Sequence, residues 1–155
     1  MRLLRCAAFI AALPFALAAC AVTGGAGGAQ FRTQPGDTVY LIEHYVRADR
    51  RQQFEEFVET VLWPAFQRSA ARSPARGRAW RQTRLLRPTT ANEDGTYTYT
   101  FVLDPVVRGE SYNVLDLLGE AYPEEEAKQH YARFTDTWAR DFTSRPFIQG
   151  RASGS

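Results

Sequence analysis

"VYLIEHYV" (residues 39–46) is the stretch that decides the fold of this chain. It is rich in β-branched and aromatic residues, which favours a β-strand. Successive side chains of a strand point to opposite faces. One face holds Tyr40, Ile42, His44 and Val46, and the other holds Val39, Leu41, Glu43 and Tyr45. Both faces are largely apolar, so we expect this strand to be covered on both sides.

A helix is predicted soon after this strand. Its apolar residues recur with the spacing of one buried helix face: Phe54, Phe57, Val58, Val61, Leu62 and Ala65. Asp49 is the expected N-cap, because its side chain can accept a hydrogen bond from the first turn. We expect Pro64 to kink or end the helix, because proline has no N–H to donate.

A β-hairpin is predicted next. Residues 78–87 are expected to form a second strand from their place in the chain, and residues 88–95 are rich in turn formers that end in Asp94-Gly95, a typical hairpin signal. Residues 96–104, "TYTYTFVLD", alternate strictly. One face of this third strand holds Tyr97, Tyr99, Phe101 and Leu103, and the other holds threonines.

Two helices and a last strand complete the predicted order. Residues 111–121 predict a short helix with Val114, Leu115 and Leu118 inward. Pro123 suits the first turn of a longer helix. The three glutamates at residues 124–126 would stabilise the positive N-terminal end of that helix. The expected buried stripe of this helix is Ala127, Tyr131, Phe134, Trp138 and Phe142. Residues 145–150 are expected to form a short final strand.

The resulting order is β-α-β-β-α-β, which defines a ferredoxin-like α+β domain over residues 37–150. This plan has a four-stranded antiparallel sheet with both helices on one face. The opposite face would be bare, although Val39, Leu41 and Tyr45 are apolar there. Two copies that pair their sheets face to face would cover it.

Such a pairing resembles the dimeric α/β-barrel superfamily, which includes antibiotic-biosynthesis monooxygenase-like and NIPSNAP-like domains. The opening "YLIEHYVRADRRQQFEEFV" (residues 40–58) is similar to the NIPSNAP opening, although Ala48-Asp49 replace the common Pro-Gly turn. The resemblance implies a homodimer. It leaves the activity open, because the superfamily holds cofactor-free oxygenases, isomerases, haem enzymes and proteins without a known reaction.

Residues 1–19 are organised like a bacterial signal peptide. Arg2 and Arg5 precede fourteen almost wholly apolar residues, fewer than the roughly 20 that span a bilayer. The segment ends in "LAAC" (residues 17–20), which resembles the lipobox of bacterial lipoproteins. An ordinary signal peptide or a buried N-terminal helix is the alternative.

The lipobox resemblance implies that Cys20 is lipidated, so that membrane lipid is a partner of the chain. Ala21, rather than Asp, implies the cell envelope at the periplasmic face of the outer membrane. Residues 20–36, rich in glycine, are expected to form a flexible tether. Residues 151–155 are expected to be a disordered tail.

Charge and cysteine content exclude several classes of function. Residues 1–19 hold two arginines and no acid, so the rest of the chain carries 17 basic and 17 acidic residues. The basic isoelectric point of the whole chain therefore does not indicate binding to nucleic acid. The expected location outside the cytoplasm also excludes nucleic acid as a partner. Cys6 lies in the signal and Cys20 in the lipobox, so we expect no disulfide, thiol nucleophile or thiolate metal site.

Glu43 and Tyr45 are the candidate catalytic residues. In a barrel they would project into the space between the sheets, where burial would raise the pKa of a carboxyl group and suit it to acid–base chemistry. The alternative is that Glu43 pairs with an arginine of a neighbouring strand and completes the core.

His44 and His130 are the only histidines. We expect each to be an ordinary surface or edge residue, because no His-x-His, His-x₃-His or carboxylate cluster accompanies them. No metal and no cofactor are predicted.

Charge is segregated along the chain. Residues 60–92 hold seven arginines and no acid, whereas residues 93–126 hold nine acids and one arginine. Guanidinium groups bind carboxylates and phosphates. Arg78 and Arg84, with Trp80 between them, are therefore the candidate residues for binding a small anion. The alternative is ion pairing between the two blocks.

The sequence leaves three functions open: non-catalytic binding of a small ligand or protein, a cofactor-independent monooxygenase-like or isomerase-like enzyme, and a structural envelope protein. No nucleophile elbow, phosphate-binding loop or dinucleotide fingerprint is present in the sequence. An enclosed cavity of several hundred Å³ that contains Glu43 would favour the enzyme.

Overall fold

The computed structural model describes residues 34–151 of the chain. Four strands form one antiparallel sheet in the order β2-β3-β1-β4. They are β1 (Thr38–Val46), β2 (Thr83–Leu86), β3 (Tyr97–Leu103) and β4 (Trp138–Ile148). This order and the antiparallel pairing confirm the predicted ferredoxin-like α+β fold.

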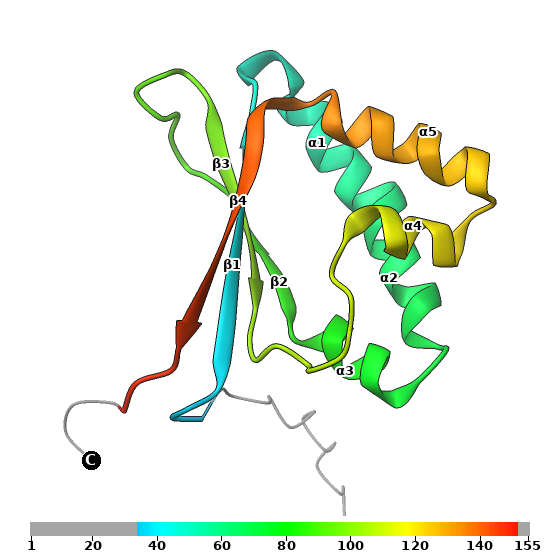
Figure 1. Ribbon diagram of the computed structural model, residues 1–155. Helices are drawn as coiled ribbons and strands as arrows, with labels where there is room; N and C mark the ends of the chain where they lie inside the picture. Colours follow the sequence, from blue (N-terminus) through cyan, green and yellow to red (C-terminus); the bar gives the residue numbers. More distant parts are fainter. Residues whose placement is uncertain (1–33, 152–155) are drawn as a thin grey trace, which may run out of the picture. The chain divides into compact units, whose positions relative to one another are not determined.

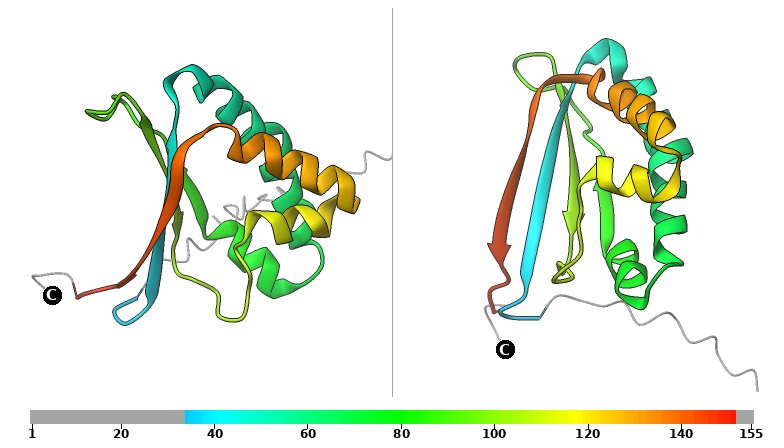
Figure 2. Two further views of the ribbon diagram at one scale, coloured as in Figure 1. Left: turned by 45° about the horizontal axis from the view of Figure 1, so that its top comes forward. Right: turned by 45° about the vertical axis from the view of Figure 1, so that its right-hand side comes forward.

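The helices lie on one face of the sheet (Figures 1 and 2). They are α1 (Arg51–Phe57), α2 (Trp63–Ala70), α3 (Pro74–Arg81), α4 (Val114–Ala121) and α5 (Glu124–Thr135). The predicted β-α-β-β-α-β plan is therefore present. Helix α3 is an addition before β2, whereas α4 before α5 corresponds to the short helix predicted over residues 111–121. None of the helices in residues 34–151 is both long and apolar enough to cross a membrane.

The central strand β1 has the two faces that its alternation predicted. In its register with β3, Ile42 lies opposite Phe101 and His44 opposite Tyr99. His44 and Val46 are buried on the face toward the helices, whereas Glu43 and Tyr45 lie on the outer face and are half-buried. His44 is therefore an interior residue, contrary to the prediction of a surface or edge histidine.

Pro64 neither ends the helix nor lies near its end. Residues Val58–Leu62 form a widened π-helical turn, and α2 continues from Trp63 to Ala70. The backbone N–H of Trp63 bonds to the carbonyl of Val58, five residues earlier. The wider turn makes room for the proline ring at the start of α2, where a missing N–H costs little.

Asp49 is not the N-cap that the sequence predicted. It lies within a short 3₁₀ helix, Ala48–Arg50, and the caps of this turn and of α1 are Arg47 and Arg50, with no side-chain hydrogen bond. The Asp49 carboxylate instead lies 3.7 Å from Nε of Arg50. It therefore contributes charge to this turn, whereas its side chain caps nothing.

The predicted strand 78–87 is wrong over its first half. Pro74–Arg81 is helix α3, and the hydroxyl oxygen of Ser73 caps it by accepting a hydrogen bond from the Arg76 N–H (3.1 Å). Serine followed by proline is a helix-start signal. Only Thr83–Leu86 pair as strand β2, so the antiparallel β2–β3 hairpin is confirmed, with Gly95 in its long loop at a φ of +77°.

The C-terminal boundary also differs from the prediction. Helix α5 ends at Thr135, and the Thr137 hydroxyl donates to the Phe134 carbonyl (2.6 Å). Trp138 and Phe142 therefore belong to β4, which spans eleven residues and pairs with most of β1. In α4 the inward side chains include Leu117, whereas Leu115 is 38% exposed, contrary to the prediction.

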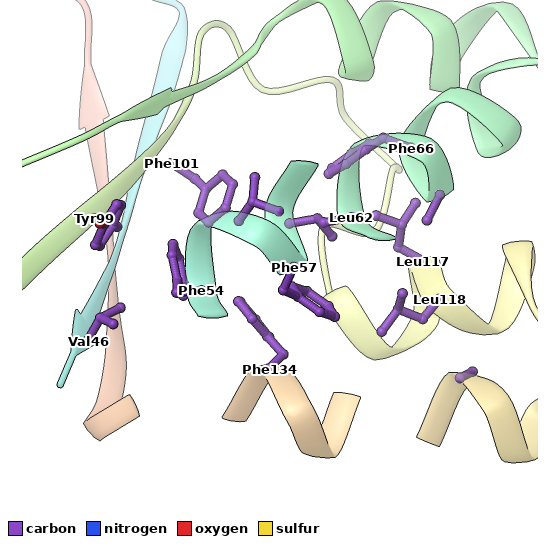
Figure 3. Packing of buried hydrophobic residues seen from close by; sticks show 13 residues of the cluster. Val46, Phe54, Phe57, Leu62, Phe66, Tyr99, Phe101, Leu117, Leu118 and Phe134 are labelled. Carbon is purple, nitrogen blue, oxygen red and sulfur yellow. The ribbon is translucent and has the colours of Figure 1, made fainter. Parts of the chain in front are cut away.

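The core is aromatic and lies between the sheet and the helices (Figure 3). Its fully buried side chains include Phe54, Leu62, Tyr99, Leu118 and Phe134. Every buried member of this cluster lies between residues 46 and 134. The described residues belong to one compact unit and contain its core, so we expect this domain to fold by itself.

The predicted signal peptide, Cys20, most of the tether and most of the tail lie outside the described residues. At the N-terminal edge of the described region, the backbone N–H of Gly36 donates to the Gln149 carbonyl (3.0 Å). The Gln149 N–H donates in turn to the Asp37 carbonyl (2.9 Å). The two ends of the domain are thereby joined beside β1 and β4.

Candidate functional site

A cavity lies between the sheet and the helices. Its walls come from all four strands, from α2 and α5, and from residues 112–114 at the start of α4. About 80 Å³ of it is open to the centre of a water-sized sphere, whereas one water needs about 10–15 Å³ on that measure. The cavity can thus hold several waters or a small organic group.

No charged side chain of residues 34–151 lines the cavity. Ten of the fourteen lining residues are aliphatic or aromatic residues such as Ile42, Phe66 and Leu103, and the other four are His44, Thr83, Tyr112 and Asn113. Tyr131 and Trp138, counted among the aromatic residues, add a hydroxyl group and an indole N–H to these polar groups. Burying an unpaired charge in such surroundings is costly, so the walls favour a neutral ligand.

His44 is the central polar residue of the cavity. Five aromatic rings surround its imidazole at centroid distances of 5.0 Å (Trp138), 5.1 Å (Phe134), 5.5 Å (Phe101 and Phe142) and 6.1 Å (Phe54). Its side chain is 3% exposed, and Nδ1 has no hydrogen-bond partner among the described residues. Burial lowers the pKa of His44 to about 4, so the ring is neutral at pH 7.

The indole of Trp138 is the neighbour of His44 on β4. Its Nε1–H is buried and has no acceptor among residues 34–151. Two unpartnered nitrogens therefore lie in neighbouring rings on the cavity wall. Buried polar groups are normally hydrogen-bonded, so these two nitrogens are the polar atoms of the wall that lack a partner in the described protein.

The remaining polar lining groups are partly engaged by the protein. The Thr83 hydroxyl donates to the Ala79 carbonyl (2.7 Å), and the Asn113 amide oxygen accepts hydrogen bonds from the first turn of α4. The Tyr112 hydroxyl oxygen accepts from the Val107 N–H (3.0 Å), and burial raises the pKa of this phenol. The phenolic proton of Tyr112 remains free to donate.

Arg76 positions the segment that carries Tyr112 and Asn113. Its guanidinium donates to the Ser111 carbonyl (2.5 Å) and pairs with Glu110 (3.0 Å) and Glu120 (2.5 Å). The Arg76 side chain is only 13% exposed. Three contacts from one planar cation therefore fix residues 110–113 against α3 and α4.

The predicted catalytic residues Glu43 and Tyr45 do not line this cavity. They lie on the outer face of the sheet, where Glu43 accepts hydrogen bonds from Arg145 (2.6 Å), Thr143 (3.0 Å) and Tyr45 (3.3 Å). Burial alone would raise the pKa of Glu43, but these donors outweigh it and lower the pKa. The structure thus has the arginine-paired arrangement that was the alternative.

The predicted anion-binding residues are not brought together. Arg78 is exposed on α3, whereas Trp80 packs into the core against Trp63 (5.2 Å between centroids) and Phe66 (5.5 Å). Arg84 pairs with Asp104 on the outer sheet face (2.6 Å). This pair and those of Arg76 join the basic block to the acidic block, as the alternative prediction expected.

His130 is buried, contrary to the prediction of a surface histidine. It is 8% exposed and packs on the ring of Tyr122 (4.6 Å), with Arg133 at Nδ1 (2.5 Å). It is not a cavity residue. Within the part of the chain that the structure describes, no group of three or more His, Cys, Asp or Glu side chains could hold a metal ion.

Sequence reasoning missed His44 as a site residue, although a signal was present. The alternation of β1 placed a histidine among Ile42 and Val46 on a face expected to be buried. A polar ring at such a position requires a partner or marks a site. Trp138 gave no comparable signal, because the helical spacing assigned it to the preceding helix.

The fold and the site define a ferredoxin-like α+β protein with an uncharged, aromatic cavity between its sheet and its helices. No family model matches the chain, and no curated protein matches it in sequence. Among solved structures, a Caulobacter crescentus CB15 protein described as a "putative antibiotic biosynthesis monooxygenase" is similar at 13% identity and a TM-score of 0.39. The match covers 76% of this chain and 92% of that chain.

Proposed function

We propose that this protein is a lipid-anchored envelope protein that binds a small neutral molecule in the cavity around His44. The observation that carries the proposal is an unpartnered, neutral imidazole in a cavity wall without any charged side chain. Ligand sites are typically apolar with a few polar groups that fix orientation. This cavity has that composition.

The anchoring part of the proposal rests on the lipobox resemblance at residues 17–20. Acyl chains on Cys20 would hold the domain at the membrane surface. The periplasmic face of the outer membrane is the location that Ala21 favours. A neutral, partly membrane-soluble ligand would be abundant at such a surface.

The binding part is tested by filling the cavity. Val114 lines the cavity, whereas its neighbour Leu115 is 38% exposed and does not. Val114→Trp should abolish ligand binding, and Leu115→Trp, the matched control, should retain it. Native mass spectrometry of the protein from its own cells should show a bound neutral molecule on the wild type and on the control only. Equal occupancy of all three proteins would contradict binding in this cavity.

Catalysis in the same cavity is the second candidate function. It is favoured by the position of His44, a polar ring on the wall of an apolar cavity. Because burial lowers the pKa of this imidazole to about 4, it is a weak base, and its role would be to hydrogen-bond and orient the substrate. A cofactor-independent monooxygenase-like or isomerase-like reaction would use this residue in place of Glu43 and Tyr45. Turnover of the recovered ligand under air would support it, and recovery of the ligand unchanged would support binding alone.

We also propose that the protein is a homodimer. No helix of residues 34–151 covers the outer face of the sheet (Figure 2), which carries the half-buried Val39 and Leu41 beside Phe147, 46% exposed. A second copy of this face would bury these side chains. Sedimentation velocity should give twice the chain mass, and Phe147→Glu should shift the protein toward monomer. A monomeric wild type would contradict the proposal.

A further inference from the structure

The cavity gives more information about its ligand than polarity alone. Its volume, its charge and its unpartnered nitrogens each restrict the chemistry that can bind. The inference below rests on the proposed binding function and concerns the class of ligand.

Size is the first restriction. A cavity of about 150 Å³ holds one benzene ring, and this cavity has about 80 Å³. Phe142 lines it and is 46% exposed, so the cavity opens to solvent beside that ring. The ligand is therefore at most a small ring that reaches toward the mouth, or the end of a longer molecule.

Charge is the second restriction. No Asp, Glu, Lys or Arg lines the cavity, and its basic neighbour Arg76 is occupied by Glu110 and Glu120. A carboxylate or ammonium group in the cavity would be unpaired and desolvated. This cavity is thus unsuited to the small anion that the arginine-rich block suggested.

Hydrogen bonding is the third restriction. Nδ1 of His44 has no hydrogen-bond partner among the described residues, and the residue is only 3% exposed. A neutral imidazole has one N–H donor and one acceptor nitrogen. A hydroxyl group both donates and accepts, so it can pair with His44 in either tautomer, whereas an ether or ketone oxygen can only accept. The free phenolic proton of Tyr112 is a second donor on the same cavity wall.

We propose that the cavity selects a small neutral molecule that carries a hydroxyl group, and that this hydroxyl hydrogen-bonds to the imidazole of His44. The aromatic rings around His44 hold the apolar body of the ligand. His44 distinguishes this ligand from an isosteric hydrocarbon, because binding the hydrocarbon would leave the imidazole unpaired.

The test compares phenol, toluene and benzoate as probes of the same ring size. Isotope-labelled protein comprising residues 31–155 is titrated with each probe, and the Trp138 indole N–H signal reports on the cavity. Wild-type protein should bind phenol and toluene but not benzoate. In His44→Phe, the ratio of phenol affinity to toluene affinity should fall at least about tenfold. His130→Phe replaces the other buried histidine, outside the cavity, and should leave this ratio unchanged.

A second measurement keeps the test valid if His44→Phe does not fold. The imidazole nitrogen signals of wild-type His44 should shift strongly with phenol and only weakly with toluene. If both probes bind and the affinity ratio is the same in wild type and His44→Phe, the hydroxyl assignment is wrong but the binding function stands. If neither probe binds, the proposed binding function is itself overturned. Benzoate that binds as tightly as phenol would overturn the requirement for neutrality.

Discussion

Nε of Arg76 lies 3.0 Å from the Glu110 carboxylate, which ties helix α3 to the segment that carries Tyr112 and Asn113 into the cavity wall. The same guanidinium pairs with Glu120 on α4. The cavity thus depends on an ion-pair network outside it. Arg76, from the basic block, thus fixes the position of part of the acidic block. The sequence of either block by itself does not indicate this pairing.

Arg76→Ala should destabilise the domain by about 2 kcal/mol, because it leaves two partly buried carboxylates without a partner. Urea unfolding of residues 31–155 measures the change. Arg87→Ala is the matched control, since the Arg87–Glu59 pair is 52% exposed on both sides and should cost less than about 1 kcal/mol. Equal losses in the two variants would contradict the positioning role of Arg76.

His44 should make the domain less stable in mild acid. Its pKa is about 4 in the folded protein, against about 6.5 in the unfolded chain. Between these two pH values the unfolded state binds a proton that the folded state does not. The free energy of unfolding is therefore highest above pH 6.5 and decreases as the pH falls toward 4. The total loss is about 3 kcal/mol. Unfolding free energies measured across this pH range give the slope.

His44→Phe should remove most of that slope between pH 6.5 and 4.5. The lowered pKa values of Glu43 and Glu120 act in the same direction but at lower pH, because carboxyl groups titrate near 4.5 when unfolded. A variant that keeps the wild-type slope above pH 4.5 would show that His44 is not the group responsible.

Glu43→Gln should lower stability by about 1 kcal/mol and leave cavity binding unchanged. The carboxylate accepts three hydrogen bonds on the outer face of the sheet, and the amide replaces only part of them. Phenol affinity and unfolding free energy, measured on the same protein, separate the two effects. Loss of phenol binding at full stability would restore Glu43 as a site residue.

Trp80→Ala should destabilise the domain by about 3 kcal/mol, because the indole packs against Trp63 and Phe66 in the core. Arg78→Ala, two residues earlier and exposed, should change stability by less than about 0.5 kcal/mol. Thermal unfolding of both variants tests this contrast. A Trp80→Ala protein as stable as the wild type would indicate that the ring is available for a ligand.

Cys20→Ser should abolish fatty acylation and release the protein from the membrane. Serine lacks the sulfur that a thioether requires, so no acyl chain would be attached at this position. Metabolic labelling with a fatty acid and membrane fractionation measure both effects. Labelled, membrane-bound Cys20→Ser protein would contradict the lipoprotein assignment.

The sequence alone determined the order of the main elements, because alternation in β1 and β3 and the helical spacing of Phe54 to Ala65 are local patterns set by backbone geometry. It did not place His44 in the interior, because the prediction was a surface or edge histidine, whereas the residue is 3% exposed. It could not place Trp138 on a strand, because an aromatic residue at helical spacing also fits a helix. Only pairing with β1 decided the matter.

The cavity itself was decided by tertiary structure. Its wall joins β1, β4, α5 and residues 112–114, which are far apart in the chain, and Arg76 fixes part of it through a contact over 34 residues with Glu110. Burial of His44 and pairing of Glu43 with Arg145 follow from the same packing. Long-range packing sets solvent exposure, and solvent exposure sets whether a titratable side chain is charged. Local sequence patterns do not determine either quantity.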